Sequence, residues 1–268
     1  MLILDRVLSR IERSRLLRRA DRRPSPPSNP AEILSTASSA ADRIANGGSV
    51  SKSIASLEAL EWAKAQPAWW HDSGNLGVPV LERLCHHNQR IGARYSAETG
   101  CGLSTIILSA LVERHLCFTV ATGNSLSHVQ AAPHLHKENV SFVIGPSQLT
   151  LPKFSFSHPL DSVLIDGGHG FPFAQLDYYY FYPQIRRGGL LIVDDIHIPV
   201  VNQLYEVLKE DAMWKHLENV VYTAFFERTD APLFDPHADN WWLQGFNKKH
   251  FKNREALQSV LGEKWWEQ

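Results

Sequence analysis

Three aspartates stand where they could hold a metal ion. Asp166 ends the apolar run that begins at Asp161, and Asp194 and Asp195 end the run that begins at Gly188. If the two runs are neighbouring parallel strands, their ends lie about 5 Å apart. A divalent cation with oxygen ligands at about 2.1 Å bridges such a gap, whereas carboxylates without a cation repel one another. The pattern predicts a Mg²⁺ site formed by Asp166 with Asp194 or Asp195.

These carboxylates also have a structural interpretation. One would cap the following helix, and another would accept hydrogen bonds from the glycine-rich loop. Successive side chains of a strand point to opposite faces, so Asp194 and Asp195 cannot both point into the site if the strand continues through them. We expect one of the two to bind the metal and the other to orient it.

Two histidines follow the aspartates closely. His169 comes after Gly167-Gly168, and His197 comes after Asp195. Imidazole titrates near neutrality, so either is a candidate general base for a hydroxyl group, although loop histidines also serve as solvated or capping residues. We favour His169, because the two glycines allow it to turn toward the site.

A glycine turn stands earlier in the chain. Gly100 and Gly102 follow a predicted strand and open a predicted helix, so a ligand can approach the backbone N–H groups closely. Thr105 occupies the place of the third glycine in G-x-G-x-x-G, and no Gly-Lys-Ser/Thr follows. The turn favours a nucleoside ligand smaller than a dinucleotide. Its alternative is a purely structural strand-to-helix turn.

Composition limits the classes of protein. The chain has 268 residues, 44% of them hydrophobic and 21% charged, with a net charge of -1, which is typical of a soluble globular protein and argues against nucleic acid as a partner. No apolar run reaches the roughly 18 residues of a membrane span. Three cysteines without a CxxC pair, Cys85, Cys101 and Cys117, indicate a reducing, cytoplasmic compartment.

The chain divides into three parts. Residues 1–23 contain eight arginines against three acidic residues, which predicts a basic amphipathic helix that touches a membrane or a protein partner, or, as we favour, a solvated extension. Residues 24–30 (PSPPSNP) form a linker. Residues 31–76 are predicted to be a helical cap, and residues 77–268 the main domain.

The main domain alternates short apolar runs with helical segments, as in a parallel sheet with crossover helices. Strands are expected at 93–98, 116–121, 140–144, 161–166 and 189–194, and helices at 78–90, 103–114, 125–133, 171–183 and 199–214. Val220–Glu227 and Asn240–Phe246 are expected to pair as an antiparallel hairpin. The predicted fold class is α/β, Rossmann-like and doubly wound, with a mostly parallel sheet, a C-terminal antiparallel hairpin and an N-terminal helical extension.

Four motifs in order resemble the class I S-adenosylmethionine-dependent methyltransferases. They are the segment from Glu98 to Thr105, Ile165-Asp166-Gly167-Gly168-His169, Asp177, and Gly188-Gly189 leading to Asp194-Asp195. The match covers residues from about 90 to 248 and is greatest to the small-molecule O-methyltransferase branch, some of whose members use magnesium. The resemblance implies a seven-stranded sheet with its last strand antiparallel.

The resemblance also implies roles for individual residues. Gly100 and Gly102 would face the methionine part of S-adenosylmethionine, and Glu98 would brace their turn. Ser104 and Thr105 would begin the helix beneath the cofactor. Asp166 would approach both cofactor and metal, with Asp194 and Asp195 as the remaining acidic ligands, and a small-molecule hydroxyl group would accept the methyl group.

The sequence departs from the family after its second strand. The family usually places an acidic residue there for the ribose hydroxyls, but Val120-Ala121-Thr122-Gly123-Asn124 contains none. Thr122 or Asn124 would then contact the ribose. The departure keeps open a cofactor-fold binding protein without catalysis. A nicotinamide oxidoreductase is a third hypothesis, which Thr105 and the closing hairpin oppose.

Aromatic clusters remain outside these motifs. The run Tyr178–Tyr182 is expected to lie in a helix packed on the sheet, with part of it in the protein core. This argues against a stacking platform for nucleic acid. Residues 69–72 (WWHD) would form either a lid over the acceptor or, as we favour, packing. Trp241 and Trp242 are assigned to the last strand, and Trp265 and Trp266 to a sheet edge or an oligomer interface.

Overall fold

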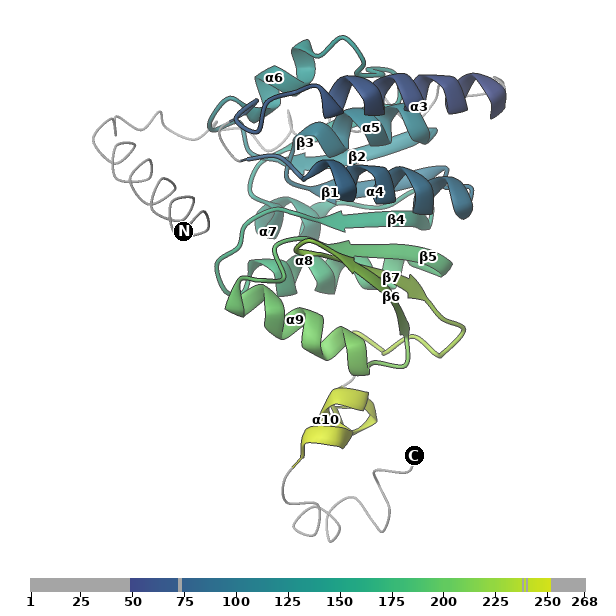
Figure 1. The fold of residues 1–268 in the computed structure, drawn as a ribbon. Coiled ribbons are helices and arrows are strands. Elements are labelled where there is room, and N and C mark those ends of the chain that lie inside the picture. The colour runs from purple at the N-terminus through teal and green to yellow at the C-terminus, as the bar shows by residue number, and fades with distance from the viewer. Residues whose placement is uncertain (1–48, 72–73, 238, 240, 252–268) are drawn as a thin grey trace, which may run out of the picture. The chain divides into compact units, whose positions relative to one another are not determined.

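The computed structural model describes residues 49–251 except 72, 73, 238 and 240, and these residues form one seven-stranded sheet covered by helices (Figure 1). The strands are β1 Tyr95–Thr99, β2 Arg114–Thr119, β3 Val140–Ile144, β4 Leu160–Ile165, β5 Ile185–Val193, β6 Trp214–Val220 and β7 Thr223–Arg228. The helices are α3 Ser49–Lys64, α4 Val78–Arg90, α5 Leu103–Leu111, α6 Ser125–Ala131, α7 Ser147–Thr150, α8 Phe173–Phe181, α9 Pro199–Glu210 and α10 Gly245–His250. The predictions for residues 1–48, Asp72, Trp265 and Trp266 lie outside the described residues.

The sheet has the order β3-β2-β1-β4-β5-β7-β6. Strands β1 to β5 pair in parallel, and β7 runs antiparallel to both β5 and β6. This arrangement confirms the predicted fold class, a mostly parallel sheet with a C-terminal antiparallel hairpin. Helix 78–90 and strand 140–144 have the predicted bounds, and the other parallel strands begin or end a few residues away.

The prediction of the hairpin is confirmed for strand 220–227, which corresponds to β7, and was wrong for strand 240–246. Its two strands are β6 and β7, joined by Val221 and Tyr222, whereas Trp241–Leu243 form a 3₁₀ turn and Gly245–His250 form α10. Trp241 and Trp242 are therefore not in a strand. β6 lies at the sheet edge with mostly exposed or half-buried residues, and such an edge strand needs no apolar alternation to mark it in the sequence.

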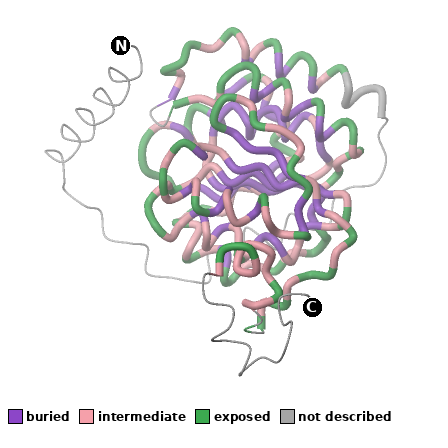
Figure 2. The backbone as a smooth tube through the Cα atoms, turned by 60° about the horizontal axis from the view of Figure 1, so that its bottom comes forward, coloured by how far each residue is buried: buried purple, intermediate pink, exposed green. Residues whose placement is uncertain are grey.

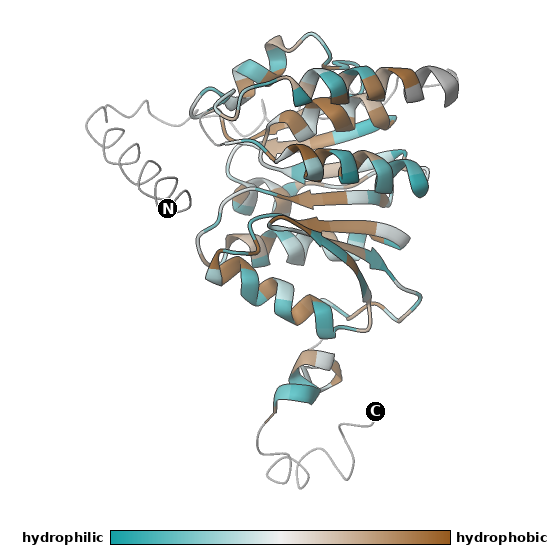
Figure 3. Ribbon diagram, in the orientation of Figure 1, coloured by the Kyte–Doolittle hydropathy of each residue, from teal (hydrophilic) through white to brown (hydrophobic). Residues whose placement is uncertain are grey.

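The sheet has an apolar layer on each face. In β4, Leu164 faces the layer formed with α3, α4 and α5, while Val163 and Ile165 face the layer formed with α8 and α9. β5 alternates in the same way. Buried residues therefore concentrate in the central strands (Figure 2), which are also the most hydrophobic segments (Figure 3). Strands covered on both faces explain the continuous apolar runs of the sequence.

The helices before β1 belong to the first of these layers. α3 contributes Ala59, Leu60 and Ala63 to the core, and α4 contributes Val80, Leu81 and Leu84. Pro79 stands in the first turn of α4, where its missing N–H costs no helical hydrogen bond. Among the described residues, no helix has the length and apolar character to cross a membrane.

Candidate active site

The ends of β1, β4 and β5 form one carboxyl edge. Thr99 lies beside Ile165, and Ile165 lies beside Val193. The N–H of Asp166 donates to the carbonyl of Thr99 (3.1 Å), and that of Asp194 donates to the carbonyl of Ile165 (3.0 Å). The glycine turn and both aspartate motifs therefore begin side by side.

Gly100 joins the first two of these strand ends. Its φ is +96°, and a Cβ there would overlap the backbone carbonyl of Asp166. Only glycine meets both conditions without strain. The turn and the aspartate that ends β4 thus meet directly, which the interpretation as a cofactor site requires.

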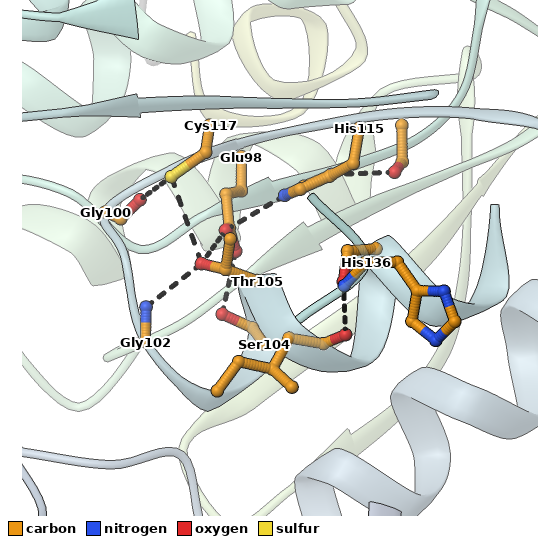
Figure 4. Close-up of polar contacts among 11 residues, drawn as sticks. Glu98, Gly100, Gly102, Ser104, Thr105, His115, Cys117 and His136 are labelled. Carbon is orange, nitrogen blue, oxygen red and sulfur yellow. Dashed lines mark hydrogen bonds and ion pairs between the residues drawn. The ribbon is translucent and has the colours of Figure 1, made fainter. Parts of the chain in front are cut away.

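Glu98 braces this turn from inside the protein, as the resemblance implies (Figure 4). Its carboxylate accepts hydrogen bonds from Ser104 Oγ (2.7 Å) and from Thr105 Oγ1, and His115 Nε2 lies 3.0 Å from it. All four side chains are buried. Thr105 Oγ1 also accepts the N–H of Gly102 at 3.1 Å.

The network directs these polar side chains away from the carboxyl edge. Ser104 and Thr105 use their hydroxyl groups to fix the start of α5 against Glu98. His115 completes the network through Ser96 Oγ at 2.8 Å. Cys117 donates from Sγ to the carbonyl of Gly100 (3.1 Å), and burial raises the pKa of its thiol well above the usual value.

The loop after β2 contains the predicted ribose contacts. Thr122 is exposed and Asn124 is half-buried, while Ser125 is buried at the start of α6. Thr122 can therefore meet a ligand from solvent, but no side chain in residues 120–124 carries an acid.

Asp166, His169 and Asp195 form a cluster at the carboxyl edge. One ligand atom from each lies within 4.8 Å of the others. His169 Nε2 is 2.9 Å from Asp195 Oδ2 and 3.9 Å from Asp166 Oδ1. Asp195 has a φ of +57°, so a left-handed backbone after the end of β5, rather than strand alternation, brings its carboxylate into the cluster.

Asp194 does not share the environment of Asp195. Its Oδ1 accepts a hydrogen bond from Thr223 Oγ1 on β7. Burial and the nearby Asp166 raise the pKa of Asp194 to about 8. Of the two aspartates, Asp195 joins Asp166 and His169, and Asp194 is tied to the hairpin.

The charges of the cluster depend on one another. Burial, followed by repulsion from Asp195, raises the pKa of Asp166. Asp166 and Asp195 raise the pKa of His169 to about 9, so at neutral pH the imidazole holds a proton that compensates the carboxylates. The predicted role of His169 as a general base needs the imidazole without that proton. A cation held by the same three atoms would displace that proton but would occupy Nε2, so His169 would then be a metal ligand and not the base.

The donors present suit a divalent cation. Two carboxylates and one imidazole converge on one point, and the raised pKa of His169 shows that the carboxylates favour a positive charge there. Oxygen ligands suit Mg²⁺ and Mn²⁺, and imidazole suits later first-row metals. His197, the other candidate base, lies at the rim, with Nδ1 3.5 Å from Asp195 Oδ1 and its ring 4.2 Å from that of Tyr222.

Two further residues reach this edge. Asp177 of α8 is fully buried beneath the aspartate loop, and a Cβ at Gly167 would lie 3.2 Å from its Oδ2. His71 is also buried and contacts Gly102 and Ser125. The sequence marks Asp177 only through the resemblance. It gives no signal that separates His71 from a packing residue, because both contacts cross a long stretch of chain.

Known proteins share this architecture. Residues 97–196 match a family model described as "Methyltransferase domain". A putative O-methyltransferase from Klebsiella pneumoniae has a TM-score of 0.51 at 16% identity, over 74% of this chain and 96% of that chain. The O-methyltransferase TomG from Streptomyces achromogenes, solved with S-adenosylmethionine, has a TM-score of 0.49 at 15% identity, over 73% and 96%. No curated protein sequence matches.

Residues 97–196 are thus similar to methyltransferase domains, and the fold of the described residues is similar to that of the putative O-methyltransferase from Klebsiella pneumoniae. The matched segment runs from β1 to the residue after Asp195. It therefore contains the glycine turn, Asp177 and the whole acidic cluster, but not His71.

Proposed function

We propose that this protein transfers a methyl group from S-adenosylmethionine to a hydroxyl oxygen of a small molecule, with help from a divalent cation such as Mg²⁺. The observation that supports it is that Asp166 belongs to both parts of the site. Its backbone closes against Gly100 in the glycine turn, and its carboxylate belongs to the cluster with His169 and Asp195. The sulfonium cofactor and the acceptor would therefore meet above this residue.

Methyl transfer is an in-line displacement. A bond forms between the acceptor oxygen and the methyl carbon while the bond from that carbon to sulfur breaks. The sulfonium becomes a neutral thioether, and the hydroxyl proton passes to solvent water. The protein's main task is to align the two reactants. A bound cation would orient the hydroxyl group and lower its pKa.

The side chains divide this work. Asp166 and Asp195 would hold the cation, with His169 Nε2 as the third ligand atom. Asp194, fixed by Thr223, would orient the end of β5. Glu98 keeps the glycine turn in place through Thr105, so the methionine part of the cofactor would meet a preformed backbone.

A binding protein without catalysis is the second candidate. The observation that favours it is the loop after β2, whose residues 120–124 carry no acid for the ribose hydroxyls. Such a protein would keep the glycine turn and the acidic cluster but bind the cofactor weakly or only for a structural purpose.

The test is turnover of S-adenosylmethionine with a panel of phenols, sugars and aliphatic alcohols. We expect S-adenosylhomocysteine to form with at least one acceptor, to decrease in excess chelator and to return with Mg²⁺. Asp166→Asn should lower this turnover at least about 10- to 100-fold, the range already typical of residues around a metal site. Asp230→Asn is the control, because Asp230 is an exposed carboxylate outside the cluster.

Three results would contradict parts of the proposal. Full activity in excess chelator would reject the role of the metal. Transfer to amines with no transfer to any hydroxyl would reject the acceptor class. Cofactor binding without turnover of any acceptor would favour the binding protein.

A further inference from the structure

His71 connects the two loops on which the cofactor would rest. It lies in no helix or strand and is 5% exposed. Its Nδ1 is 3.2 Å from Ser125 Oγ, and a Cβ at Gly102 would lie 2.9 Å from its Nε2. One imidazole therefore contacts the glycine turn after β1 and the first residue of α6 after β2.

The segment that carries His71 is itself fixed. The carbonyl of Trp70 lies 2.7 Å from His128 Nδ1 of α6, and the Trp70 ring packs edge-on against Trp62 of α3 at 5.6 Å. Asn75 reaches back to the carbonyl of Pro67 at 2.9 Å. The residue before His71 is thus held by contacts with α3 and α6.

The position of the imidazole has a consequence for the turn. Gly102 precedes α5, whose first N–H groups lack helical partners and form the positive end of the helix. The space that a side chain at Gly102 would fill is taken by His71. Any movement of the imidazole would therefore change the backbone that faces the carboxylate of the cofactor's methionine part.

We propose that His71 is a positioning residue for the amino-acid end of S-adenosylmethionine. It holds the glycine turn at Gly102 in its binding shape, and its hydrogen bond to Ser125 keeps the imidazole in place against that turn. The inference rests on the proposed function. It assigns a role to a residue before the segment that matches the methyltransferase family.

Isothermal titration with two ligands tests this role. S-adenosylhomocysteine carries the amino-acid end, and 5′-methylthioadenosine lacks it. His71→Ala should weaken S-adenosylhomocysteine binding about tenfold, the loss expected for one hydrogen-bonded contact, and should leave the affinity for 5′-methylthioadenosine nearly unchanged. His71→Asn keeps a polar partner for Ser125, so its affinity for S-adenosylhomocysteine should lie between those of the wild type and His71→Ala.

His87→Ala is the matched control. His87 is equally buried, at 5% exposure, but contacts Glu218 of β6. Both alanine variants should lower the melting temperature, and only His71→Ala should lower affinity for S-adenosylhomocysteine. If both variants lost the same affinity for S-adenosylhomocysteine, the loss would come from general destabilisation, and the inference would be overturned.

Other outcomes separate this inference from the proposed function. Wild-type affinity in His71→Ala, an equal loss for both ligands, or an Asn variant as weak as the Ala variant would overturn the role of His71 alone. No binding of S-adenosylhomocysteine to the wild-type protein would overturn the proposed function, and this inference with it.

Discussion

Asp194 and Asp195 are neighbours in sequence with different environments. Asp195 lies in the cluster with Asp166 and His169, and Asp194 is bonded to Thr223. The sequence predicts that one of the pair binds and the other orients. It does not say which one, because the choice depends on the left-handed backbone at Asp195 and on a hairpin strand that follows 29 residues later.

This difference predicts unequal effects on metal binding. Asp195→Asn should weaken Mn²⁺ binding about 10- to 100-fold, while Asp194→Asn, which keeps an acceptor for Thr223, should have a smaller effect. Titration of the full chain with Mn²⁺, followed by calorimetry, measures both. If Asp194→Asn weakened Mn²⁺ binding more than Asp195→Asn, the metal ligand would be Asp194 instead.

Asp177 gives a prediction about pH. Burial raises its pKa above the ordinary 3.8, despite Ser147 and Thr99 nearby. At a pH between the ordinary value of 3.8 and the raised pKa, Asp177 keeps a proton in the folded state that it has released in the unfolded chain. The free energy of unfolding therefore falls as the pH rises through this window. Each unit of elevation corresponds to about 1.4 kcal/mol.

Asp177→Asn removes this titration. The variant should match the wild type in stability near pH 3.8 and become more stable than it as the pH rises, until the difference levels off. Urea unfolding at several pH values measures the difference in free energy of unfolding. A variant less stable than the wild type at pH 8 would mean that the ionised carboxylate is used by the fold.

At the scale of elements, strands buried on both faces were the most predictable. Their apolar runs place β1, β4 and β5 close to the expected bounds, and Pro79 with the apolar spacing of α4 predicts that helix over its whole length. β3 lies at a sheet edge and is mostly half-buried, but its apolar sequence also predicts its bounds. β6 was missed because an exposed edge strand lacks an apolar pattern. Residues 241–246 were assigned wrongly to a strand because their aromatic side chains are as typical of strands as of the turn and helix that contain them.

The glycine turn predicts a contrast between two glycines. Gly100 and Gly92 both have positive φ, at +96° and +60°, but a Cβ at Gly92 meets nothing within 4 Å, while one at Gly100 overlaps Asp166. Gly92→Ala should therefore show only the backbone cost of about 1–2 kcal/mol. Gly100→Ala should destabilise the protein more than Gly92→Ala does, and it should also abolish binding of S-adenosylhomocysteine.

Urea unfolding and calorimetry of the two variants provide this comparison. Equal destabilisation and unchanged affinity in both would show that the contact between Gly100 and the Asp166 carbonyl is not needed. The ends of β1 and β4 would then be free to separate without harm to the site.

At the scale of the molecule, the fold brings distant segments to one edge. The connection between α3 and α4 supplies His71, the end of β1 leads into the glycine turn, and the ends of β4 and β5 lead into the acidic cluster. The order β3-β2-β1-β4-β5 reverses its direction of growth at β1, and ligands of open α/β sheets bind beyond the carboxyl ends of the strands at such a switch point. Sequence patterns predicted the edge and helix 78–90, but not that His71 would contact the glycine turn.

Calorimetric titration of S-adenosylhomocysteine into the full wild-type chain tests the central claim most directly, because it needs neither an acceptor nor a metal. We expect one molecule to bind per chain. Bound ligand should also stabilise the fold by about 2.7 kcal/mol at a concentration one hundred times the Kd. No heat of binding together with an unchanged melting temperature at millimolar ligand would contradict the assignment of the Gly100 turn and the end of β4 as a cofactor site.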